Sequence, residues 1–137
     1  MLKYFLAWLG MIPLAIANGV LRQAWYGQYL DELAAHQVST FTAMLLFGIY
    51  ISAVMRWSPP RSNAQAVSIG LMWFGFTVLF EFLLGRYIAG HSWRALVQDY
   101  NLFAGRVWLL ALLFIAAAPY VFHRLENASD SAGARPK

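Results

Sequence analysis

One carboxylate stands out because it interrupts a long apolar stretch. Glu81 lies within the apolar run 79–84, and no other charged residue occurs between Arg61 and Arg86. A carboxylate in such a helix is costly unless it is paired, protonated or in contact with water. We therefore expect one of two roles for Glu81. Either it locks helix packing through an ion pair, for which Arg22 and Arg106 are the best placed partners, or it binds a proton or a ligand.

Further polar side chains lie near the same ends of the apolar segments as Glu81. The candidate ligand-binding residues are Glu81, Arg22, Arg86, Arg106, Asn18, His36, His91 and Asp99. The arginines suggest an anionic partner, because the guanidinium fork binds carboxylates and phosphates bidentately. We therefore predict a polar, arginine-lined pocket for an anionic small molecule or lipid.

Metal and catalytic chemistry are less favoured by the sequence. Glu32 and His36 share a helix face at spacing i, i+4, but no recognised metal-ligand motif is present. The sequence has no Gly-x-Ser-x-Gly motif, and the neighbours His91 and Ser92 would not face each other on a helix. We expect no metal, no cofactor and no catalytic residue, and an enzyme is the less favoured class.

The composition indicates whether these residues belong to a soluble protein or to a membrane protein. Of 137 residues, 61% are hydrophobic and 12% are charged, whereas soluble domains carry about 45–50% apolar and about 25% charged residues. A chain this small cannot bury such an excess in one aqueous core. The net charge of +4 is scattered along the chain, which does not indicate nucleic-acid binding. Cysteine is absent, so disulfides and thiol chemistry are excluded. The composition predicts an integral membrane protein.

Four apolar segments approach the length of about 20 residues that a spanning helix needs. They cover about residues 2–20, 38–54, 66–84 and 107–122. We therefore predict an all-α bundle of four transmembrane helices over residues 1–124, followed by a disordered cytoplasmic tail over 125–137. The first segment also resembles a secretory signal, although Asn18 and Arg22 follow it without a soluble domain, which favours an uncleaved helix.

Two connecting segments show helical periodicity of their own. Residues 27–37 and 91–106 place apolar side chains at helical spacing, and Ser92 is a candidate N-cap. Both segments predict short amphipathic helices at the membrane interface or packed on the bundle end. Within the spans, Ala66 and Gly70 form a small-xxx-small spacing that permits close helix contact.

The distribution of basic residues predicts the orientation. With four spans, six basic residues fall on one side, namely Lys3, Arg56, Arg61, Arg124, Arg135 and Lys137. Four fall on the other, namely Arg22, Arg86, Arg94 and Arg106. The positive-inside rule places the first set, with both termini, in the cytoplasm. We expect a bacterial inner membrane, with the polar pocket at the outer face.

The sequence thus predicts a small membrane protein that binds an anionic small molecule or lipid. If the protein transports this ligand, we expect Glu81 to couple transport to a proton. Four spans are few for a transport path, so we expect a homodimer or a larger complex. Two alternatives stay open. One is a non-catalytic accessory subunit of a membrane complex, and the other is a lipid-modifying or metal-dependent membrane enzyme.

Overall fold

The computed structural model describes residues 1–133, and within them every regular element is helical. The four long helices are α1 (Leu2–Ala24), α2 (Glu32–Trp57), α3 (Asn63–Leu83) and α5 (Trp108–Gly133). The short elements are η1 (Tyr26–Gln28), the π-turn η2 (Leu84–Ile88), α4 (Trp93–Gln98) and η3 (Leu102–Ala104). All four long helices are long and apolar enough to cross a membrane.

The start of α2 differs from the prediction. The Asp31 side chain accepts a hydrogen bond from the Ala34 amide at 2.7 Å, so it caps a helix that begins at Glu32 and continues to Trp57. The segment 27–37 is therefore not a separate amphipathic helix, because the chain passes from η1 directly into the first turns of α2.

The second connecting segment contains only a short helix. Ser92 caps α4 by accepting from the Ala95 amide at 3.2 Å, as the sequence suggests. The predicted helix over 91–106 ends early, at Gln98, and η3 follows it. Gly105 then adopts φ +79, a conformation that favours glycine, and the chain turns into α5.

Close approach of α3 and α5 holds one side of the molecule together. Ala66 and Gly70 of α3 are buried, and a Cβ atom at Gly70 would overlap the carbonyl oxygen of Ala116 in α5. This small-residue spacing therefore serves packing within the chain. The large buried side chains of the four helices form one hydrophobic core: Tyr4, Trp8, Phe47, Ile51, Met55, Ile69, Trp73 and Ile115.

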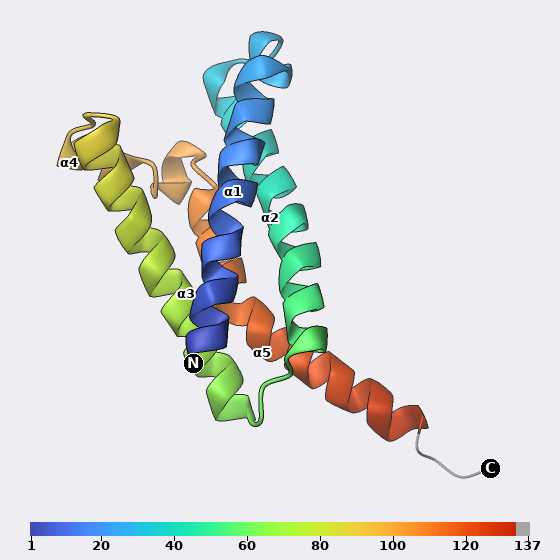
Figure 1. Ribbon diagram of the computed structural model, residues 1–137. Helices are drawn as coiled ribbons and strands as arrows, with labels where there is room; N and C mark the ends of the chain where they lie inside the picture. The colour runs from blue at the N-terminus through green and yellow to red at the C-terminus, as the bar shows by residue number, and fades with distance from the viewer. Residues whose placement is uncertain (134–137) are drawn as a thin grey trace.

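α1 and α3 approach each other at the N-terminal end of α1 and separate toward the end that carries α4 (Figure 1). Where they approach, the Trp73 indole donates to the Tyr4 carbonyl at 2.7 Å. One turn farther along, the Trp8 indole donates to the Thr77 hydroxyl at 3.0 Å. Between the separated halves, beside α2 and the start of α5, lies a cavity that the next subsection describes.

The last helix extends into the segment predicted as a tail. α5 continues to Gly133, so residues 125–133 are helical where the sequence predicts disorder. The Glu126 carboxylate lies 3.7 Å from the Arg56 guanidinium, at the end of α2. The remainder of the predicted tail, 134–137, lies outside the described residues.

Candidate functional site

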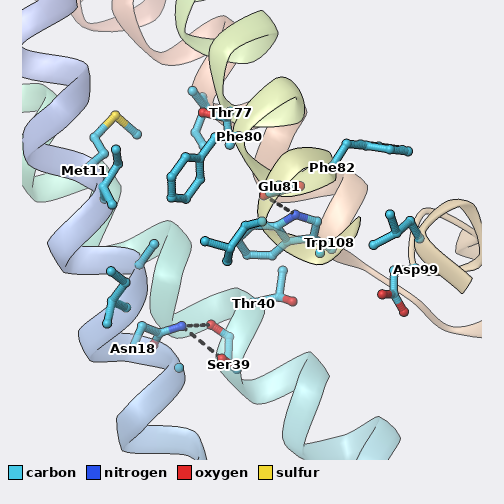
Figure 2. Close-up of a pocket in the computed structure, with 18 of the residues that line it drawn as sticks. Met11, Asn18, Ser39, Thr40, Thr77, Phe80, Glu81, Phe82, Asp99 and Trp108 are labelled. Atoms are coloured by element: carbon cyan, nitrogen blue, oxygen red, sulfur yellow. Dashed lines mark hydrogen bonds between the residues drawn. The ribbon is translucent and has the colours of Figure 1, made fainter. Parts of the chain in front are cut away.

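The partly buried Glu81 carboxylate accepts hydrogen bonds from two uncharged donors. Glu81 lies on α3, and its Oε2 accepts from the Tyr100 hydroxyl at 2.6 Å. Its Oε1 accepts from the Trp108 indole nitrogen at 2.8 Å, a bond that Figure 2 shows. Neither Arg22 nor Arg106 forms an ion pair with it in the part of the chain that the structure describes. Of the two roles considered for Glu81, the ion pair with Arg22 or Arg106 is therefore not formed there, and the carboxylate instead joins α3 to the segment before α5 and to the first turn of α5.

The environment of Tyr100 keeps its hydroxyl protonated and able to donate a hydrogen bond. Its ring stacks on Phe82, with the ring centroids 5.7 Å apart. Burial, and then the charge and hydrogen bond of the Glu81 carboxylate, raise the pKa of the Tyr100 phenol above its ordinary value. The phenol therefore stays protonated and keeps its hydrogen bond to Glu81 well into the alkaline range.

Arg106 serves the connection between α2 and the last helix. Its guanidinium lies 3.3 Å from the Glu32 carboxylate and 3.7 Å from the Asp99 carboxylate. Nearby, the Gln37 side-chain amide donates to the Gly105 carbonyl at 3.0 Å. These contacts hold the segment before α5 against the start of α2.

Two polar contacts join α1 to α2, one turn apart on each helix. In the first, Asn18 Nδ2 donates to the Ser39 carbonyl and hydroxyl oxygens, each at 2.9 Å (Figure 2). In the second, Arg22 Nη1 lies 3.2 Å from His36 Nδ1. Arg22 has no carboxylate within 4 Å among residues 1–133. Its charge is therefore available for an anion.

Both contacts leave buried polar atoms without partners. Asn18 is only 5% exposed, and its Oδ1 atom accepts no hydrogen bond within residues 1–133. The same is true of His36 Nε2, which is buried and has no partner there. Buried polar atoms in native structures are normally paired with protein, water or ligand.

These residues line a cavity of about 410 Å³, the size range of small-molecule sites. Toward the N-terminal end of α1 its walls are apolar and are formed by Trp8, Met11, Ile12, Phe47 and Ile115. Toward the α4 end the walls are mixed: apolar residues such as Phe82, Leu84 and Leu96 lie among polar ones, namely Asn18, Arg22, His36, Ser39, Thr40, Glu81, Asp99 and Tyr100. The cavity is therefore amphipathic along the length of α1.

The structure brings most of the predicted site residues together. Six of the eight line this cavity: Asn18, Arg22, His36, Glu81, His91 and Asp99. Arg86 does not line it, because its guanidinium lies over the Trp93 ring, 5.7 Å from the ring centroid. Arg106 acts from outside the lining, through Asp99. In residues 1–133, no three His, Asp or Glu side chains gather closely enough to hold a metal ion.

Sequence reasoning missed the two donors to Glu81. The positions of Tyr100 and Trp108 suggest an aromatic belt at the membrane interface, which gives no reason to turn either ring inward. A usable signal is that a phenol and an indole each carry one donor that must find an acceptor when buried.

Comparison with protein families, with characterised proteins and with solved structures gives no match to this chain. The functional argument therefore starts from the cavity.

Proposed function

We propose that this chain is an integral membrane protein that binds an amphipathic anion in the cavity between α1, α2 and α3. The membrane part of the proposal is supported by the four apolar helices and by what covers their surfaces. Large apolar side chains are exposed on every long helix, among them Leu6, Ile16, Phe41, Leu45, Ile49, Leu71, Leu79, Leu113 and Val121. Apolar exposure on this scale matches the acyl chains of a bilayer far better than water.

The observation that carries the ligand proposal is the Arg22 guanidinium at the polar end of an otherwise apolar cavity. An arginine in this position keeps its charge and offers donors in a fixed fork. Its only side-chain partner within residues 1–133 is a ring nitrogen of His36, which leaves further donors free for an anionic group. The apolar walls from Trp8 to Phe47 then suit a hydrocarbon chain attached to that group.

The acidic residues near the site are each engaged by donors of the chain, whereas Arg22 is not paired with a carboxylate within residues 1–133. Asp99 is paired with Arg106. The second carboxylate that faces Arg106 belongs to Glu32, whose side chain is 88% exposed. Glu81 is engaged by Tyr100 and Trp108. These two bonds support a role for Glu81 in holding the segment before α5 against α3. Proton coupling and transport remain predictions from the sequence.

The test compares ligands of equal chain length and different head-group charge. Protein in nanodiscs is mixed with tetradecanoate or tetradecanol, and bound ligand is counted by native mass spectrometry. We expect the wild type to prefer tetradecanoate and Arg22→Gln to lose that preference. The loss should be roughly tenfold in affinity, the effect of one charge-assisted hydrogen bond.

The matched control is Arg94→Gln. Arg94 is an exposed residue of α4 that does not line the cavity, so its loss should leave the preference unchanged. Equal binding of the two ligands by the wild type, or an unchanged preference in Arg22→Gln, would contradict an anion site at Arg22.

A further inference from the structure

The two unpartnered atoms at the polar end of the cavity have opposite hydrogen-bonding character. Asn18 faces the Ser39 carbonyl, which can only accept, so the amide nitrogen must point there and Oδ1 must point away. Oδ1 is an acceptor, and it therefore needs a donor that residues 1–133 do not supply.

His36 presents the complementary case. The Arg22 guanidinium has donors only, so His36 Nδ1, at 3.2 Å from it, must accept. A neutral imidazole that accepts at Nδ1 carries its hydrogen at Nε2. The buried Nε2 is therefore a donor, and no acceptor for it lies within the described part of the chain.

Neighbouring hydroxyls supply neither the donor that Asn18 Oδ1 lacks nor the acceptor that His36 Nε2 lacks. The Thr40 hydroxyl donates to the His36 carbonyl at 2.9 Å, so its hydrogen is already used within α2. Ser39 Oγ accepts from the Asn18 amide nitrogen, on the side of Asn18 away from Oδ1. The open acceptor and the open donor thus remain. On α1 the two contacts involve Asn18 and Arg22, which lie one helical turn apart, with about 5–6 Å between their Cβ atoms.

From this pattern we infer that the ligand is an amphipathic anion with a hydroxyl group a few atoms from its anionic group. The anionic oxygens accept from Arg22 and from His36 Nε2, and the hydroxyl donates to Asn18 Oδ1, one turn farther into the cavity. The inference rests on the proposed function, because it specifies the head group of the same ligand.

Two kinds of molecule carry this chemistry, a hydroxylated fatty acid and a lysophosphatidate with a free glycerol hydroxyl. The experiment uses a probe pair for each. One pair is 3-hydroxytetradecanoate and tetradecanoate, and the other is 1-tetradecanoyl-glycerol-3-phosphate and its analogue without the glycerol hydroxyl. Full-length protein in nanodiscs is titrated with each probe, and dissociation constants are measured.

We expect the hydroxylated member of at least one pair to bind about fivefold more tightly to the wild type, the effect of one net hydrogen bond. The pair that shows the difference identifies the source of the ligand. In Asn18→Leu the difference should vanish, because the acceptor is lost while the volume stays similar.

Asn63→Leu is the matched control. It makes the same substitution at an exposed residue that does not line the cavity, so the hydroxyl preference should persist. A preference that disappears equally in both variants would overturn the assignment to Oδ1.

The outcomes separate this inference from the proposal on which it rests. Equal affinity of the wild type for both members of each pair, with binding still dependent on Arg22, would overturn the hydroxyl inference and leave the anion site standing. Failure of all four probes to bind would overturn both. The wild-type measurement alone is decisive if Asn18→Leu does not fold.

Discussion

The partly buried Glu81 carboxylate is hydrogen-bonded by Tyr100 and Trp108, and these bonds stabilise the contact between α3 and the last quarter of the chain. Removing the Tyr100 hydroxyl leaves the carboxylate with a single donor, Trp108. We expect Tyr100→Phe to lower the free energy of unfolding by about 1–3 kcal/mol, the cost of an unmet hydrogen bond to a buried charge. Denaturation in detergent, followed by circular dichroism, measures the change.

Tyr87→Phe is the control for that variant, because Tyr87 is 73% exposed and forms no side-chain hydrogen bond within residues 1–133. The pH dependence gives a second check. The folded-state pKa of Tyr100 is raised, so its contribution is fully present below the unfolded-state pKa of about 10 and is lost only at higher pH. A difference between wild type and Tyr100→Phe that shrinks between neutral pH and pH 9 would contradict this donor role.

How far the site can be predicted from sequence depends on the kind of contact. Glu81 is identifiable because a charge in an apolar run is rare and costly. Its two partners are not identifiable from the sequence. A carboxylate is expected to pair with a positive charge, whereas the actual donors are uncharged and lie 19 and 27 residues away. Arg22 with His36 is equally hidden, since nothing in the sequence fixes which turns of α1 and α2 meet.

Packing of α3 on α5 requires a residue without a side chain at position 70. Any side chain at Gly70 must push against the Ala116 backbone, whereas Gly75, on the same helix, has no atom within 4 Å of an added Cβ. Gly70→Ala should destabilise the protein by about 1–3 kcal/mol through overpacking. Gly75→Ala should stabilise it by up to about 1 kcal/mol through helix propensity.

The two glycine variants are compared by thermal unfolding in the same detergent. Changes of the same sign in Gly70→Ala and Gly75→Ala would contradict the close approach of α3 and α5.

Helix existence is readable from hydropathy, and helix limits are not. Each of the four predicted spans falls on a long helix, because apolar runs of this length have few other solutions in lipid. Five of the eight ends extend farther than predicted, because polar turns continue a helix once it has started and a cap such as Asp31 or Ser62 sets where it begins. This is why the segment 27–37 fails as a separate helix.

Taken as a membrane protein, the molecule places η1 and the α2–α3 turn at opposite ends (Figure 1). The natural absence of cysteine allows a clean test with single cysteines. Tyr29, which is 80% exposed beside η1, and Trp57, which is 89% exposed at the end of α2, are suitable positions. An impermeant maleimide added to intact cells should label Tyr29→Cys, and it should label Trp57→Cys only after permeabilisation, if both termini are cytoplasmic.

The reverse pattern would contradict the orientation while keeping the four spans. Labelling of both cysteines in intact cells would contradict the spans themselves.

The late position of the Glu81 partners also sets an order for biosynthesis. In the proposed membrane protein the spans emerge from the ribosome in sequence, so α3 reaches the bilayer before the segment that carries Tyr100 and Trp108 has left the ribosome. Until then the Glu81 carboxylate has neither donor, and Gly70 has no helix to pack against. A chain that ends before residue 108 would therefore lack the Trp108 donor to Glu81 and the helix that packs on Gly70.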